Sequence, residues 1–138
     1  MKLSLDTNVL IEFLDGNETV RRAYEAALDD GHEMFISVIV AHELRFGARL
    51  SGRDIEVRTA EALLERFSIE AFTESDAEGA TQVRVALERI GRRIGAMDML
   101  IAGQAMARGW AVVTANVNEF GRVAGLGVID WTQLPESP

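Results

Sequence analysis

Residues 2–8, with the sequence KLSLDTN, decide the fold because a strand pattern runs directly into an aspartate. Polar and apolar side chains alternate from Lys2 to Leu5, and this alternation is typical of a short, half-buried strand. Asp6 follows at once, and helix-forming residues continue from about Val9 to Leu14. The opening of the chain is therefore a strand, an acidic turn and a helix.

Predicted strands and helices follow one another along the rest of the chain. Further strands are predicted at 34–36, 69–72, 111–114 and 127–130. Helices are predicted at 19–30, 38–50, 53–67, 75–93 and 97–108. Helices thus separate nearly every strand, which predicts a parallel sheet with helices on both faces and an α/β fold class. With no repeat or linker, residues 1–138 are expected to form one domain.

Composition limits the chemistry that this domain can perform. The chain has 138 residues, a formal net charge of −8 and no cysteine, which excludes disulfides and thiolate zinc sites. The negative charge argues against a protein that holds nucleic acid mainly by nonspecific attraction to phosphate. No secretory signal and no membrane-spanning run is recognised, so a cytoplasmic protein without a membrane partner is expected.

Acidic and amide side chains follow the predicted strands. Asp6 follows the first strand, Asn116 follows the fourth, and Asp98 opens the helix that precedes the fourth. Ligands of parallel α/β sheets bind beyond the carboxyl ends of the strands, where the strand order reverses. Taken singly, Asp6 is also explained as a helix cap and Asp98 as an aspartate favoured by the helix dipole.

Glu43 is the most informative residue by pattern. Ile39 and Val40 lie one helical turn before it, and Phe46 and Gly47 lie one turn after it, so Glu43 shares an apolar stripe. A carboxylate on a core-facing stripe needs a compensating partner. The alternatives are a salt bridge to an arginine such as Arg45 or Arg49, a position at the edge of the stripe, or a metal ion, which we prefer.

Three carboxylates without a cysteine or histidine cluster suit a hard cation such as Mg²⁺ or Mn²⁺. Asp6, Glu43 and Asp98 are the predicted ligands, and such an ion supports phosphodiester hydrolysis by orienting water and neutralising charge on the phosphate. Asn116 and Glu119 are candidates for further ligands, with a turn asparagine and a solvated loop glutamate as the ordinary alternatives.

Four polar residues near the strand ends are candidates for bracing these ligands by hydrogen bonds. They are Thr7, Asn8, Ser37 and Thr114. Large apolar side chains are instead interpreted as core filling. They are Phe120, Trp110, Trp131, Met97, Met99 and Met106.

At these residues the chain resembles the PIN-domain family and, within it, the VapC toxins of bacterial toxin–antitoxin pairs. Residues 5–8 (LDTN) resemble the first acidic motif of the family, and Glu43-Leu44 followed by Gly47 resembles the second. Residues 94–102, around Asp98, are similar to the third motif. Thr114, Asn116, Glu119-Phe120 and Asp130-Trp131 match the C-terminal pattern, so the resemblance covers essentially the whole chain.

This resemblance implies a five-stranded parallel sheet and a metal-dependent endoribonuclease that cleaves structured RNA, transfer RNA in particular. It also implies a cognate antitoxin of the VapB type, a homodimer and a toxin–antitoxin hetero-oligomer. Asp6, Glu43 and Asp98 match the acidic triad, and the fourth acidic place is filled by Asn116 or displaced to Glu119. Arg45 and Arg49, which follow Glu43, are candidates for holding phosphate or an antitoxin carboxylate.

Two other classes of function compete with this interpretation. A phosphoacceptor domain also places an aspartate after its first strand, but it needs a lysine near the site, and Lys2 would lie at the wrong end of that strand. A catalytically silent PIN domain that binds RNA or protein is made plausible by Asn116 in place of an acid. The retained triad speaks against this second alternative.

Overall fold

The computed structural model describes residues 1–133, which contain five strands and seven helices. The strands are β1 (Lys2–Leu5), β2 (Glu33–Ser37), β3 (Ser68–Glu70), β4 (Ala111–Val113) and β5 (Val128–Ile129). The helices are α1 (Thr7–Leu14), α2 (Glu18–Asp29), α3 (Val38–Leu50), α4 (Asp54–Leu64), α5 (Glu74–Arg89), α6 (Ala96–Arg108) and α7 (Val117–Phe120). The predicted α/β class is confirmed.

All five strands are parallel, in the order β3-β2-β1-β4-β5. β1 therefore lies at the centre of the sheet. β2 and β3 follow on one side of β1, and β4 and β5 lie on its other side. Leu5 pairs in register with Val113, so β1 and β4 end at the same level. The order reverses between these two strands, and this is the position at which α/β sheets bind ligands.

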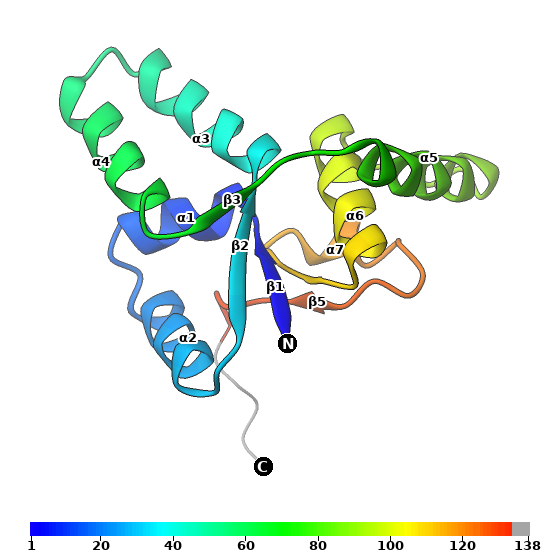
Figure 1. The fold of residues 1–138 in the computed structure, drawn as a ribbon, viewed down its shortest axis with the longest axis horizontal. Coiled ribbons are helices and arrows are strands. Elements are labelled where there is room, and N and C mark those ends of the chain that lie inside the picture. The colour runs from blue at the N-terminus through cyan, green and yellow to red at the C-terminus, as the bar shows by residue number, and fades with distance from the viewer. Residues whose placement is uncertain (134–138) are drawn as a thin grey trace.

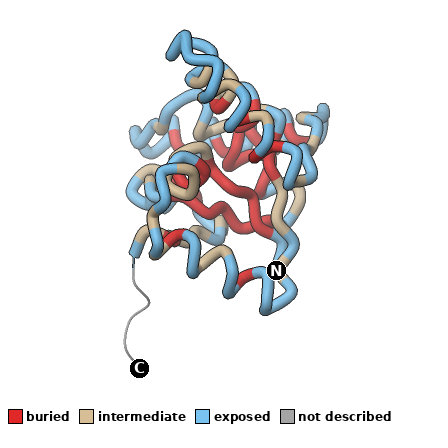
Figure 2. Tube along the Cα trace, turned by 90° about the vertical axis from the view of Figure 1, so that its left-hand side faces the viewer, coloured by how far each residue is buried: buried red, intermediate tan, exposed pale blue. Residues whose placement is uncertain are grey.

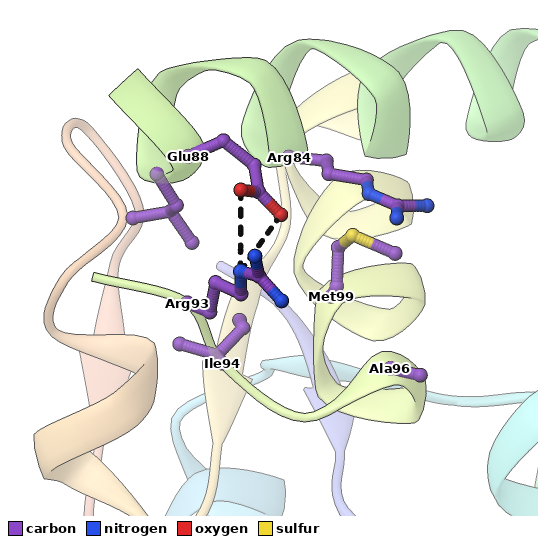
Figure 3. Close-up of a pocket in the computed structure, with 7 residues that line it drawn as sticks. Arg84, Glu88, Arg93, Ile94, Ala96 and Met99 are labelled. Carbon is purple, nitrogen blue, oxygen red and sulfur yellow. Dashed lines mark hydrogen bonds and ion pairs between the residues drawn. The ribbon is translucent and has the colours of Figure 1, made fainter. Parts of the chain in front are cut away.

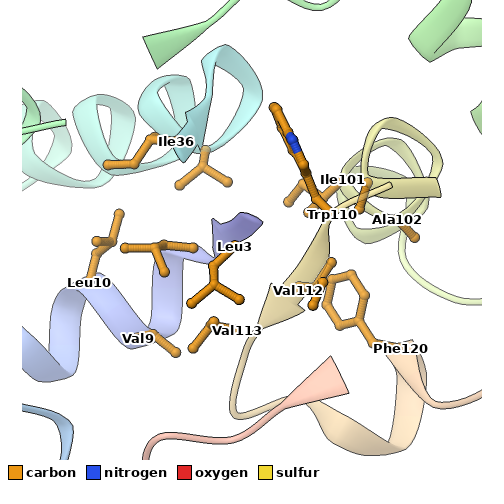
Figure 4. Close-up of a cluster of buried hydrophobic side chains, with 14 of the residues drawn as sticks. Leu3, Val9, Leu10, Ile36, Ile101, Ala102, Trp110, Val112, Val113 and Phe120 are labelled. Carbon is orange, nitrogen blue, oxygen red and sulfur yellow. The ribbon is translucent and has the colours of Figure 1, made fainter. Parts of the chain in front are cut away.

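Helices cover both faces of the sheet, as predicted. Figure 1 shows α1 to α4 on one side of the strands and α5 to α7 on the other. β1 and β4 are the most deeply buried strands, and the buried segments lie in the interior of the trace (Figure 2). Leu3, Val112 and Val113 pack with Leu10 and Phe120 in the core between these layers, where each is at most 1% exposed (Figure 4).

The long helix predicted at 75–93 is shorter in the structure. α5 ends at Arg89 because Gly91 takes a left-handed conformation with φ +66°, which a glycine adopts without strain. The segment 90–95 is therefore free to leave the helix and to lead into α6. The predicted helix at 53–67 ends at Leu64, and the four-residue helix α7 was not predicted.

Helices α5 and α6 pack against each other very closely. A Cβ atom on Gly103 would lie 2.3 Å from the backbone nitrogen of Ala80, so only glycine fits there. The pair is also held by Arg108, whose Nε and Nη2 donate to the two oxygens of the buried Asp76 at 3.0 and 2.9 Å. These contacts fix the position of α6, which carries Asp98.

Several side chains predicted to fill the core do so, and others do not. Trp110, Trp131 and Phe120 are buried. Met97 and Met106 are about two-fifths exposed, so their assignment to the core was wrong. Among the described residues, no helix has both the length and the apolar character needed to cross a membrane.

Candidate active site

Asp6 lies at the carboxyl end of the central strand and is only 4% exposed. Its Oδ1 accepts a hydrogen bond from the backbone N–H of Thr7 at 2.9 Å, which caps α1. Its Oδ2 accepts from the hydroxyl of Thr114 at 2.8 Å and from Nδ2 of Asn8 at 3.3 Å. Burial raises the pKa of Asp6, and these hydrogen bonds to Thr114, Thr7 and Asn8 oppose that rise.

Asn8 and Thr114 also join the ends of the two central strands. The Asn8 side chain donates to the Thr114 hydroxyl at 3.3 Å and accepts from the backbone N–H of Ala115 at 3.1 Å. Thr114 in turn accepts from the backbone N–H of Asn116 at 3.0 Å. The predicted bracing roles of Asn8 and Thr114 agree with this geometry, in which the loop after β4 is tied to the first turn of α1.

The other two predicted bracing residues act differently. The Ser37 hydroxyl accepts from the backbone N–H of Ile39 at 3.2 Å and thereby caps α3, without any hydrogen bond to the acidic residues. Thr7 supports Asp6 through its backbone, and its buried hydroxyl makes no close hydrogen bond but lies near enough to Glu43 to lower the pKa of that carboxyl.

Glu43 projects from the second turn of α3 and is partly buried. One of its oxygens, Oε1, is buried and accepts no hydrogen bond. Burial raises the pKa of Glu43, and the charge of Asp6 raises it further. Neither arginine neighbour compensates it, because Arg45 pairs with Glu61 at 2.8 Å and Arg49 appears in none of the ion pairs among residues 1–133. The alternative of a salt bridge from Glu43 to Arg45 or Arg49 was therefore wrong.

Asp98 lies in the first turn of α6, beside Asn116 and Glu119. Nδ2 of Asn116 donates to Oδ2 of Asp98 at 3.0 Å and to Oε2 of Glu119 at 2.9 Å. Burial raises the pKa of Asp98 to about 7, helped by a hydrogen bond with Glu119 and by the charges of Asp6, Glu119 and Glu43. The hydrogen bonds from Asp98 and Asn116 lower the pKa of Glu119.

The structure therefore gives Asn116 and Glu119 different roles. Glu119 adds a fourth carboxylate, whereas Asn116 points its amide N–H groups at two carboxylates and holds them together. The sequence interpretation missed Arg122, whose charge lowers the pKa of Glu119 and whose Nη1 donates to the carbonyl of Arg93 at 2.7 Å. Its only sequence signal is its place three residues after Glu119, one helical turn along.

A divalent cation fits this site as a hydrated ion. Within residues 1–133, no three side chains of histidine, aspartate or glutamate are grouped closely enough to form a ready chelate. The charges of neighbouring carboxylates nevertheless raise the pKa of Glu43 and of Asp98. None of the four carboxylates takes part in the ion pairs of the described residues. Mg²⁺ usually keeps several waters and binds through one or two carboxylates. The unpaired oxygen of Glu43 and the excess negative charge fit such an ion.

Known proteins with similar sequences share this architecture. The family model described as PIN domain matches residues 3–126. The chain is 35% identical over 133 residues to the tRNA(fMet)-specific endonuclease VapC of Shigella flexneri, covering 96% of this chain and 99% of that protein. The protein of the same name from Salmonella typhimurium is 32% identical, with 95% and 98% covered.

Solved structures of toxin–antitoxin complexes also resemble this chain. VapBC2 from Rickettsia felis, bound to a promoter DNA fragment, superposes with a TM-score of 0.88 at 28% identity, covering 95% of this chain and 99% of that chain. DNA-bound VapBC from Salmonella typhimurium superposes with a TM-score of 0.87 at 32% identity, covering 95% and 98%.

Proposed function

Because the chain belongs to the PIN-domain family, we propose that it is an endoribonuclease toxin that hydrolyses RNA phosphodiester bonds with Mg²⁺ or Mn²⁺. The observation that carries the proposal is that Asp6, Glu43 and Glu119 lie near enough to Asp98, at the switch point of the sheet, for their charges to raise its pKa, although no three of these side chains form a ready chelate. Their mutual repulsion is uncompensated by ion pairs in the described residues, so a cation is the natural partner.

The residues of the site divide the work as follows. Asp6 would hold the ion from the end of β1 and Asp98 from the first turn of α6, and Glu43 would orient its water shell from α3. When bound, the cation would supply an activated water and neutralise charge on the scissile phosphate. Thr114 and Asn8 hold the Asp6 carboxylate in one rotamer, and Asn116 holds Asp98 against Glu119. We propose transfer RNA as the substrate, as the names of the relatives suggest, and we propose the cytoplasm as the location.

The phosphoacceptor alternative has little support in the structure. Lys2 begins β1, at the strand end opposite Asp6, where it lies 3.9 Å from Glu33. Such a domain needs a lysine beside the reacting aspartate to stabilise the phosphoryl group.

The proposal is tested by RNA cleavage with purified protein in Mg²⁺ or Mn²⁺. We expect wild type to cleave transfer RNA and Asp98→Asn to lose cleavage, because one ligand charge is lost at nearly constant shape. Asp29→Asn, which removes an exposed carboxylate from α2, is the matched control and should cleave normally. Equal cleavage by wild type and Asp98→Asn, with circular dichroism showing both folded, would refute the assignment and favour a silent RNA-binding domain.

We also propose an antitoxin as a partner, and a groove on the surface supports this. A cavity of about 540 Å³ lies between α1, α3 and α4, with apolar walls that include Ile11, Leu44 and Ile55, and with Glu43 at one side. A peptide segment laid in this groove would reach the site and block it. Ile55→Glu places a negative charge on the apolar wall and should weaken antitoxin binding while leaving RNA cleavage intact; unchanged antitoxin affinity would contradict this location.

A homodimer is proposed from the exposed face of α3. Val38, Phe46 and Leu50 are 39%, 59% and 74% exposed, and with His42 they form a stripe at four-residue spacing, so Phe46 was wrongly placed on the buried face. An exposed apolar stripe of this kind is typical of an interface. Leu50→Glu should convert a dimer to a monomer in light scattering, and a wild-type protein that is already monomeric would refute the proposal.

A further inference from the structure

A second cavity lies beside the carboxylates, between the C-terminal half of α5 and the start of α6. It has a volume of about 210 Å³ and an apolar floor made by Leu87, Ile94 and Met99. Arg84 and Arg93 stand at its rim, as Figure 3 shows. The cavity is smaller than the pockets of about 300 Å³ and more that hold drug-sized ligands. It therefore suits one flat fragment of the size of a nucleobase.

The charges around this cavity differ from those of the chain as a whole. Residues 84–93 contain four arginines and one glutamate, a local charge of +3 in a chain of net charge −8. Arg84 makes no ion pair or side-chain hydrogen bond among the described residues. A polyanion that approaches the acidic site is repelled by four carboxylates, so a neighbouring positive segment is needed to hold it.

Glu88 partly occupies this positive surface. Its carboxylate pairs with Nε of Arg93 at 3.1 Å, and both side chains are well exposed (Figure 3). An exposed ion pair contributes little to stability, whereas a guanidinium binds phosphate with two parallel hydrogen bonds. A phosphate can therefore displace Glu88 from Arg93.

The cavity and the carboxylates share one segment of backbone. Ile94 and Ala96 line the cavity, and Gly95 between them lies against the acidic site, where a Cβ atom would be 3.7 Å from Oδ2 of Asp98. Arg122 fixes this segment by donating to the carbonyl of Arg93. A strand of RNA that crosses Asp98 would therefore meet the cavity directly beside it.

We propose that this cavity binds the nucleotide next to the scissile phosphate of the RNA substrate, with its base on the apolar floor and its phosphate held by Arg84 and Arg93. The proposal rests on the proposed ribonuclease function and adds a substrate-binding site to it. Unpaired bases stacked on apolar and arginine surfaces, with phosphates bound by arginine, are the usual mode by which proteins hold single-stranded RNA. Arg45 and Arg49 lie on α3, away from this segment, and Arg45 is already paired with Glu61.

The test combines cleavage of bulk transfer RNA in Mn²⁺ with binding of a fluorescein-labelled, single-stranded RNA of random sequence in EDTA. Arg84→Gln should raise KM about three- to tenfold and leave kcat within about twofold, as loss of one charged hydrogen-bonding group predicts. It should also reduce the slope of log affinity against log salt by about 0.7, the value for one phosphate contact on a single strand. Arg22→Gln removes the same charge from an exposed position on α2, outside both the cavity and residues 84–93, and should change neither.

Glu88→Gln should have the opposite effect, since it frees Arg93 for phosphate and lowers KM. Glu78→Gln, on the same helix but outside the cavity, is its control. If Arg84→Gln matches Arg22→Gln while wild type cleaves RNA, the cavity proposal is overturned and the nuclease proposal stands. If wild type and Asp98→Asn behave alike, both fail. Competition by poly-glutamate as strong as that by RNA would show a carboxylate-binding surface and would also overturn the proposal.

Discussion

The buried carboxylate of Asp76 offers a quantitative test of how α6 is held in place. Asp76 is 1% exposed and accepts hydrogen bonds from Arg108, Gln104 and the backbone of Thr73. Burial alone would raise its pKa, but the hydrogen bonds from Arg108 and Thr73 and the charge of Arg108 outweigh this and lower the pKa from 3.8 to about 2. We therefore expect Asp76→Asn to destabilise the protein in a pH-dependent manner.

The magnitude follows from that shift. A pKa that is lower in the folded than in the unfolded protein stabilises the fold above the unfolded value, and this stabilisation is lost as the pH falls through the folded value. The shift from 3.8 to about 2 corresponds to about 2 kcal/mol at neutral pH. Asp76→Asn lacks this contribution at every pH, so its deficit against wild type should be about 2 kcal/mol larger at pH 7 than at about pH 2.

Urea unfolding followed by circular dichroism measures this deficit at a series of pH values from 7 downward. Asp29→Asn, at an exposed position on α2, is the control and should stay within about 0.5 kcal/mol of wild type throughout. The wild-type and Asp76→Asn curves should approach each other between about pH 4 and pH 2. A deficit that is independent of pH would refute the reasoning, because it would mean that shape and not charge links Asp76 to Arg108.

Further predictions concern packing and metal. Gly103→Ala should destabilise the protein by about 1–3 kcal/mol, because the added methyl group meets the backbone of Ala80. Gly47→Ala on α3 is the control: its methyl group meets no atom, so it should stabilise the protein by up to about 1 kcal/mol. Thermal unfolding compares the two variants, and equal effects would contradict the close contact between α5 and α6. Thr114→Val removes a hydrogen bond to Asp6 and should raise the Mn²⁺ concentration for half-maximal cleavage about tenfold, which an unchanged titration curve would disprove. EDTA should abolish cleavage and added Mn²⁺ restore it, whereas activity that survives in EDTA would exclude a metal requirement.

Much of the fold could be predicted from the sequence because local patterns decide it. The alternation at Lys2–Leu5 and the apolar run at Ala111–Val113 each specify their element without help from distant residues. Helix ends were less predictable. The end of α5 depends on the conformation of Gly91, and either this glycine or Gly95 could have ended the helix on sequence alone.

The sequence predicts which acidic residues belong to the candidate site, but it does not predict the hydrogen bonds between them and their neighbours. That Asp6, Glu43 and Asp98 approach one another follows from the rule for parallel sheets. The hydrogen bonds of Asp6 to Thr114 depend on β4 lying beside β1, and no local pattern states the strand order. The choice between Asn116 and Glu119 depends on rotamers in α7, a helix of four residues that is too short to show periodicity.

The central claim is that these carboxylates bind a divalent cation, and anomalous diffraction from crystals soaked in Mn²⁺ tests it most directly. We predict one strong anomalous peak in contact with oxygens of Asp6 and Asp98, with Glu43 in reach of its water shell, and no peak in Asp98→Asn crystals. A saturating soak that leaves this position without a peak, while the same protein cleaves RNA in Mn²⁺, would contradict the account.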